Sequence, residues 1–198
     1  WTPDGKSIIC DGGRAGSSAL YTFSSEGGLP LKMPSEGQLV RPFVSPDSKW
    51  VYYTNSSTGR REVYKMPFGG GPQTQFTHEG GTDAVSSSDG TIVFFYRDGE
   101  VRRIAAAGGP ESTVTTGVKR GKWTVAGEKV YVIRARDGQS VVVEMSADGH
   151  NERVVYQVPQ QLVDDLSVVN SISVSARTGE IFLQHQNRLD SDLILVEN

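Results

Sequence analysis

The 198-residue chain has a single cysteine, Cys10, no long apolar run and no large excess of either charge. One cysteine cannot close a disulfide within the chain and cannot supply a Cys-x-x-Cys metal site. No stretch approaches the roughly 18 uninterrupted apolar residues that a transmembrane helix needs. Because 20 lysines and arginines stand against 23 aspartates and glutamates, the positive charge of a general nucleic-acid-binding protein is also missing. We therefore expect no nucleic-acid partner and no membrane contact by this segment.

The sequence also lacks the common catalytic motifs. It contains no Gly-x-Ser-x-Gly nucleophile elbow, no His-Glu-x-x-His zinc helix and no Gly-x-x-x-x-Gly-Lys-Ser/Thr phosphate loop. Its three histidines, His78, His150 and His185, fall at different positions of the repeat described next, which argues against a shared metal site. The sequence thus predicts a chain that is not an enzyme and uses no cofactor and no metal.

What the sequence does contain is an internal repeat with a period of about 40 residues. The segment TPDGKSII at residues 2–9 recurs as SPDSKWVY at 45–52 and, more weakly, as SSDGTIVF at 87–94. A second anchor, a Gly-Gly or Asp-Gly turn, follows each of the first four copies and keeps a similar spacing. Two independent anchors with the same period indicate a repeat architecture rather than chance similarity.

The second copy, residues 40–82, shows the content of one repeat. Runs rich in β-branched and aromatic residues lie at 40–44, 50–54, 62–66 and 74–77, separated by Asn, Ser, Gly and Pro. Such runs are typical of short strands joined by tight turns. Four antiparallel strands in a repeat of this length form one blade of a β-propeller.

Within residues 45–77 the sequence reads Ser-Pro-Asp-x-Lys, an apolar strand, Glu-Val-Tyr-x-Met, Gly-Gly and x-Phe-Thr. This pattern resembles the WD-type repeat of TolB-like β-propeller proteins. The resemblance covers most of the chain and becomes weak after about residue 120. It implies a bacterial protein, a periplasmic or extracytoplasmic location, and a propeller that forms the C-terminal portion of a larger multidomain protein.

We expect an all-β fold with one β-propeller of about five four-stranded antiparallel blades. Because the first repeat lacks its innermost strand and the last lacks a fourth strand, we expect part of a six- to seven-bladed ring rather than a closed ring of five. The prediction is a single domain over residues 1–198, with approximate blades at 1–39, 40–82, 83–119, 120–168 and 169–198.

The loops between the second and third strands of the blades all contain arginine. These arginines are the predicted binding residues: Arg14, Arg60, Arg97, Arg134 and Arg188. In a propeller such loops share one face with the outer-to-inner connections, and guanidinium groups suit carboxylate ligands. An alternative explanation is turn chemistry, because Arg-Asp-Gly occurs twice and aspartates accompany most of these arginines.

These observations favour a non-catalytic β-propeller binding module, the sensory or scaffolding part of a larger bacterial protein. Its expected partner is a protein or peptide, and an acidic one would match the arginines. The alternative is the propeller portion of an enzyme. That enzyme would be a prolyl-oligopeptidase-like peptidase whose hydrolase domain lies elsewhere, or a propeller lyase or hydrolase with a channel metal.

Overall fold

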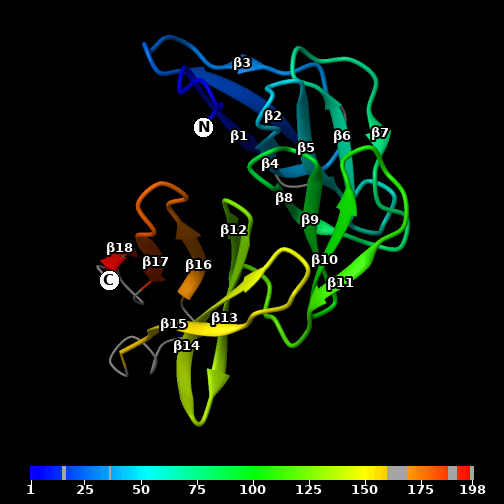
Figure 1. Ribbon diagram of the computed structural model, residues 1–198. Coiled ribbons are helices and arrows are strands. Elements are labelled where there is room, and N and C mark those ends of the chain that lie inside the picture. The colour runs from blue at the N-terminus through cyan, green and yellow to red at the C-terminus, as the bar shows by residue number, and fades with distance from the viewer. Residues whose placement is uncertain (15–16, 36, 160–168, 187–190, 197–198) are drawn as a thin grey trace. The chain divides into compact units, whose positions relative to one another are not determined.

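The computed structural model describes residues 1–14, 17–35, 37–159, 169–186 and 191–196. In these residues the chain forms five sheets whose strand pairs are antiparallel (Figure 1). The predicted all-β fold is therefore confirmed, and among the described residues three of the five sheets have four strands and two have three. None of the described residues forms a helix long and apolar enough to cross a membrane.

The five sheets follow one another along the chain, and strands that are neighbours in a sheet are also consecutive in sequence. The first sheet consists of β1 (Ser7–Arg14), β2 (Ser17–Ser24) and β3 (Leu31–Lys32). The second consists of β4 (Leu39–Val44), β5 (Trp50–Asn55), β6 (Glu62–Pro67) and β7 (Thr74–Gln75). The third consists of β8 (Thr82–Ser86), β9 (Ile92–Arg97), β10 (Glu100–Ala105) and β11 (Ser112–Thr115). The fourth consists of β12 (Trp123–Ala126), β13 (Lys129–Arg136), β14 (Gln139–Ser146) and β15 (Arg153–Gln157). The fifth consists of β16 (Val169–Val174), β17 (Ile181–Gln186) and β18 (Ser191–Val196).

The chain divides into two compact units. The first comprises Trp1–Arg97 with Ile104–Glu111, and the second comprises Asp98–Arg103 with Ser112–Asn198. The division falls within the third sheet, and each unit has its own apolar core.

In the first unit the core lies on both sides of β5. Successive residues of a strand point to opposite faces of its sheet. Val51 and Tyr53 accordingly belong to a buried cluster that includes Leu20 of the first sheet. Tyr52 belongs to a second cluster, where its ring lies edge-on to Phe76 with 5.3 Å between the centroids. Burial on both faces explains why four apolar or aromatic residues follow one another at 50–53, before the polar Thr54 and Asn55.

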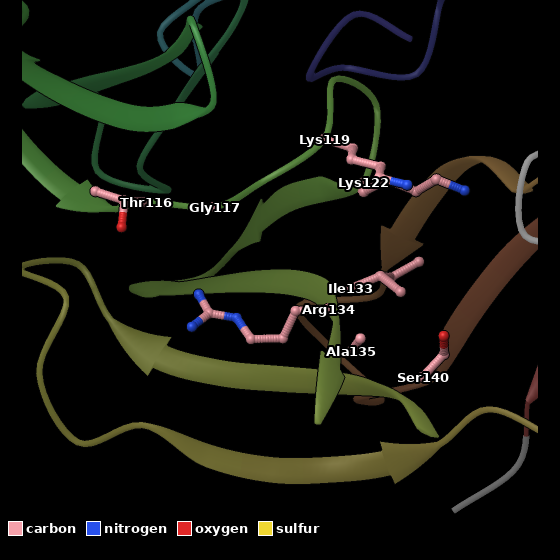
Figure 2. A pocket seen from close by; sticks show the side chains of 8 residues that line it. All are labelled: Thr116, Gly117, Lys119, Lys122, Ile133, Arg134, Ala135 and Ser140. Carbon is pink, nitrogen blue, oxygen red and sulfur yellow. The ribbon is translucent and has the colours of Figure 1, made fainter. Parts of the chain in front are cut away.

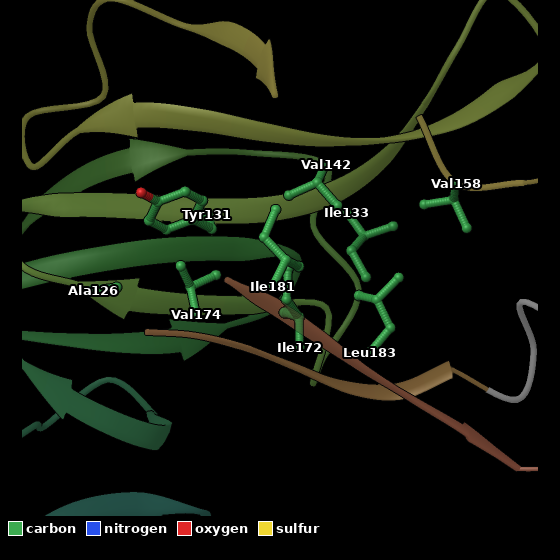
Figure 3. Close-up of a cluster of buried hydrophobic side chains, with 9 residues drawn as sticks. All are labelled: Ala126, Tyr131, Ile133, Val142, Val158, Ile172, Val174, Ile181 and Leu183. Atoms are coloured by element: carbon green, nitrogen blue, oxygen red, sulfur yellow. The ribbon is translucent and has the colours of Figure 1, made fainter. Parts of the chain in front are cut away.

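In the second unit the core lies between the fourth and fifth sheets (Figure 3). Its buried members are Ala126, Tyr131, Ile133, Val142, Val158, Ile172, Val174, Ile181 and Leu183. Ile181 and Leu183 are two positions apart on β17 and both are buried, so one face of this strand contacts the fourth sheet. Stacking of neighbouring sheets through such faces is the way repeated blades bury a continuous core.

The repeated Ser-x-Asp segment forms a turn with a fixed hydrogen-bond pattern. Ser45 Oγ donates to Asp47 Oδ1 at 2.6 Å, and the same oxygen accepts the amide of Lys49 at 3.1 Å. The Ser/Thr-to-Asp bond has the same 2.6 Å length in three further turns: Thr2 with Asp4, Ser87 with Asp89, and Ser146 with Asp148. In all four turns this side-chain hydrogen bond is the main cause that lowers the pKa of the aspartate. These hydrogen bonds within the turn account for the Ser or Thr and the Asp two residues later in each of these segments.

Candidate functional site

The predicted binding residue Arg97, at the end of β9, has a guanidinium group that other side chains largely cover. Its side chain is only 10% exposed, and Nη1 lies 2.7 Å from a carboxylate oxygen of Glu111 and 3.5 Å from one of Glu79. Its Nε donates to the carbonyl of Gly80 at 2.8 Å. Its guanidinium carbon lies 5.2 Å from the centroid of the Phe95 ring. These contacts give Arg97 a structural role, because its removal would take a cation away from the largely covered carboxylate of Glu111, which is 17% exposed.

Arg60, in the loop between β5 and β6, contacts the same connection as Arg97 but remains more open. Its side chain is 58% exposed, and Nε lies 3.6 Å from Glu62. Its Nη2 donates to the carbonyl of Glu79. Glu62 is itself buried, and it accepts the amide of Gly80 at 2.9 Å. The structure therefore brings Arg60 and Arg97 together around the Glu79 and Gly80 connection.

In the second unit, Arg134 and Arg136 near the end of β13 share one carboxylate. Arg134 Nη1 lies 3.3 Å from Glu152, and Nη2 donates to Thr115 Oγ1 at 2.7 Å. Arg136 also pairs with Glu152, and its side chain is 45% exposed. The Nε of Arg134 is buried and has no hydrogen-bond partner among the residues that the structure describes.

The remaining two predicted arginines are Arg14 and Arg188. Arg14 is the last residue of β1 and pairs through its backbone with Ser17 across the β1–β2 hairpin, but its side chain lies outside the described part of the structure. Arg188 lies outside the described residues altogether.

The aspartates next to the arginines in sequence lie in hairpin turns and are not the ion-pair partners of Arg60, Arg97 and Arg134. Asp98 and Asp137 adopt positive φ values of 45° and 52°, and the glycine after each is also at positive φ. This conformation is that of the two-residue Asp-Gly hairpin turn. For Arg60, Arg97 and Arg134, the ion-pair partners are glutamates instead. These glutamates are the site residues that the sequence analysis missed.

The first strands of the second and third sheets add a further charged pair in the first unit. Both β4 and β8 contain a register shift, and at it Arg41 and Asp83 adopt φ values of 56° and 58°. The Nε of Arg41 lies 3.0 Å from Asp83, and the Arg41 amide donates to Asp11 at 3.0 Å. Left-handed backbone at non-glycine residues is uncommon and gathers at bulges and functional sites. Arg41, whose side chain is 51% exposed, is therefore a paired arginine that remains open to solvent.

The second unit contains a pocket of about 590 Å³ that opens beside the start of β12 (Figure 2). It is lined by Thr116, Gly117, Lys119, Lys122, Ile133, Arg134, Ala135 and Ser140. Lys122 is only 8% exposed. Burial, and to a lesser extent the charge of Lys119, lowers the pKa of Lys122 from 10.5 to about 8. The pocket thus joins cationic groups to apolar side chains.

The histidines do not come together as a metal site in the described residues. His78 borders a smaller pocket of about 270 Å³ together with Lys65 and Glu111. His150 lies in the turn between β14 and β15, where its amide donates to Asp148. The side chain of His185 lies outside the described part of the structure. Across that part, no group of three or more His, Cys, Asp or Glu residues is arranged to hold a metal ion.

Residues 1–164 match the family model of the TolB β-propeller domain. The chain belongs to this family. The TolB-type repeat inferred from the sequence is thereby confirmed, and the first four sheets described above lie within the matched residues.

The chain matches only part of the length of each of the following similar proteins. A putative TolB structure from Agrobacterium tumefaciens is 18% identical, with a TM-score of 0.75, and the match covers 100% of this chain and 75% of that one. TolB from Acinetobacter baumannii is 21% identical, with a TM-score of 0.66, over 77% of this chain and 41% of that one. An uncharacterized protein from Agrobacterium fabrum is 29% identical over 105 residues, which are 51% of this chain and 36% of that protein. The domain thus spans about a third of the curated relative that it matches.

Proposed function

We propose that this TolB-type propeller domain is a non-catalytic binding module that holds an acidic segment of a partner protein. The observation that carries the proposal is the exposure of two paired arginines in the first unit. The side chains of Arg41 and Arg60 are 51% and 58% exposed, yet each lies against a carboxylate of the same unit. Their guanidinium groups are held in position and still accessible.

Such an arrangement suits recognition of carboxylates. A guanidinium has five N–H donors in a planar fork, and one neighbouring carboxylate does not use all of them. The carboxylate beside each arginine already restricts the long side chain. Less side-chain conformational entropy is therefore lost when a partner binds. The TolB-type fold alone would not favour this role, because propellers carry many unrelated functions.

The proposal is tested with a fluorescently labelled peptide of alternating Glu and Ser, followed by anisotropy. We expect weak binding that falls as salt rises, because exposed charges are screened over roughly 10 Å at 0.1 M ionic strength. Arg60→Glu should weaken binding, because it reverses one exposed cationic group.

Two controls make the result specific. The same peptide with Gln in place of Glu should not bind. Lys32→Glu makes the same change in net charge on the exposed outer strand β3 and should leave the affinity unchanged. Equal binding of the Gln peptide, or equal losses in both variants, would contradict the proposal.

A further inference from the structure

We propose that Asp137 is a modification site, at which the peptide bond to Gly138 rearranges to the β-linked isoaspartyl form. Both residues lie in the second unit, in the two-residue turn between β13 and β14 (Figure 1). The inference goes beyond the proposed function, because it concerns covalent chemistry of the chain itself and requires no partner.

The rearrangement uses two groups that every Asp-Gly pair contains. The glycine amide nitrogen attacks the side-chain carboxyl carbon of the preceding aspartate in its protonated form. A nitrogen–carbon bond forms, a carbon–oxygen bond breaks, and the amide hydrogen and the carboxyl hydroxyl leave as one water. The product is a cyclic succinimide. One water then opens the ring at either carbonyl and gives aspartate or isoaspartate, so no oxidant or other reactant is needed.

The chain contains six Asp-Gly pairs, and the structure distinguishes among them. They begin at Asp4, Asp11, Asp89, Asp98, Asp137 and Asp148. Glycine has no side chain to hinder the attack, so the six pairs are chemically alike in an unfolded chain. In the folded protein, differences in rate must come from the contacts of the carboxyl group, of the glycine amide and of the surrounding backbone.

Three of the pairs have both reacting groups engaged in hydrogen bonds. At Asp148, Oδ1 accepts the hydroxyl of Ser146 at 2.6 Å and the amide of His150 at 3.1 Å. The amide of Gly149 donates to the carbonyl of Ser146 at 2.8 Å. The same three hydrogen bonds occur in the turns of Asp4 and Asp89. The hydroxyl bond also lowers the pKa of each of these aspartates, so the protonated form that reacts is scarcer.

Asp11 is restrained within a strand rather than in a turn. Its Oδ1 accepts the amide of Arg41 at 3.0 Å. Gly12, which would supply the attacking nitrogen, is paired with Ala19 between β1 and β2. Ring closure at Asp11 would therefore have to disrupt a paired strand.

Asp137 has neither kind of protection. Among the residues that the structure describes, its carboxylate has no hydrogen-bond or ion-pair partner, and the amide of Gly138 makes no hydrogen bond. Both residues are exposed, and a Cβ placed on Gly138 would meet no atom within 4 Å. The similar turn at Asp98 is tied down, because the carbonyl of Gly99 accepts the amide of Val118 at 2.9 Å.

Ring closure also requires the aspartate backbone to rotate out of its turn conformation. Asp137 has a φ of 52°, in the left-handed region that a residue with a Cβ adopts only at a cost. Leaving this conformation is therefore less unfavourable than leaving a relaxed one. The backbone at Gly149, by contrast, is closely packed, because a Cβ there would collide with the carbonyl oxygen of Val114.

The test is incubation of the folded protein in H₂¹⁸O at 37 °C and mildly acidic pH, then tryptic digestion in ordinary water and mass spectrometry. Each passage through the succinimide introduces one ¹⁸O atom. Residues 137–153 form one tryptic peptide that contains both Asp137 and Asp148. Fragmentation then compares the two positions in one molecule. We expect at least about tenfold more ¹⁸O and isoaspartate at Asp137, because charge-assisted hydrogen bonds must first break at Asp148.

Three controls separate the effect of structure from that of sequence. In guanidinium chloride the two positions should take up ¹⁸O at similar rates, because the protecting contacts are lost. Ser146→Ala removes the hydroxyl bond and should raise uptake at Asp148 severalfold without changing uptake at Asp137. Asp137→Glu should abolish uptake at that position, because the attack would have to close a larger ring.

Three results would overturn the inference. They are equal uptake at Asp137 and Asp148 in the folded protein, faster uptake at Asp98 than at Asp137, and no uptake at Asp137 in a time that labels the unfolded protein there. None of them decides the peptide experiment with Arg60→Glu, which can succeed or fail separately.

Discussion

Glu144 of β14 allows the contribution of one covered carboxylate to the second unit to be measured. It accepts hydrogen bonds from Lys129 Nζ at 2.8 Å, from Arg153 Nε at 2.9 Å and from Tyr131 Oη at 2.9 Å. Burial alone would raise its pKa. The hydrogen bonds from Arg153, Lys129 and Tyr131 outweigh burial and lower the pKa from 4.5 to about 2.

The perturbation is Glu144→Gln, which keeps the shape and removes the charge. A pKa change from 4.5 to about 2, at about 1.4 kcal/mol per unit, corresponds to roughly 3 kcal/mol. The Glu144 side chain is only 10% exposed, but the side chains of Lys129 and Arg153 are 48% and 65% exposed, so solvent screening makes this value an upper one. Because the folded pKa is the lower one, the stabilisation is complete above pH 4.5 and is lost as the pH falls toward 2. About half of it should remain at pH 3.

The assay is urea unfolding of both proteins by circular dichroism at several pH values between 6 and 2.5. The difference in free energy of unfolding between the two should shrink by roughly 2 kcal/mol as the pH falls across that range. Glu26→Gln changes an exposed carboxylate in the first unit and should give a small, constant difference. A difference for Glu144→Gln that does not depend on pH would refute the reasoning, because it would arise from packing rather than from charge.

Two further substitutions test the packing of each unit by urea unfolding. Gly149→Ala should lower the free energy of unfolding by more than about 2 kcal/mol, because the new Cβ would collide with the carbonyl oxygen of Val114 at a position with positive φ. Gly127 also has a positive φ, 60° against 86° at Gly149, but open space lies around it, so Gly127→Ala should cost only about 1 kcal/mol. Equal losses would show that the collision at Gly149 is relieved without cost. Arg97→Ala should cost roughly 3 kcal/mol because it breaks a covered ion pair, whereas Arg60→Ala should cost less than about 1 kcal/mol. Equal losses of unfolding free energy for the two variants would show that the ion pair between Arg97 and Glu111 does not stabilise the first unit.

The features that could be predicted from the sequence are those that neighbouring residues determine. The Ser-x-Asp turn closes within five residues, and the alternation along β5 places Val51 and Tyr52 on opposite faces without knowledge of any partner. The glutamate partners could not be predicted in this way. Arg97 and Glu111 are 14 residues apart, and their contact depends on how β9, β10 and the connection to β11 are placed in space. The pocket beside Lys122 depends likewise on the distance between a loop and the edge of a strand.

The comparison of Arg97 with Arg136 explains how one repeated sequence feature can have two roles. Arg97 uses its Nε and both terminal nitrogens on Gly80, Glu79 and Glu111, so few donors remain for a partner. Arg136 uses one terminal nitrogen on Glu152 and remains nearly half exposed. An arginine whose donors are all used fixes a loop, and an arginine with donors left over can bind a carboxylate from another molecule. The partner-binding role proposed above is therefore assigned to the exposed arginines, whereas the covered Arg97 holds the conformation of its own connection.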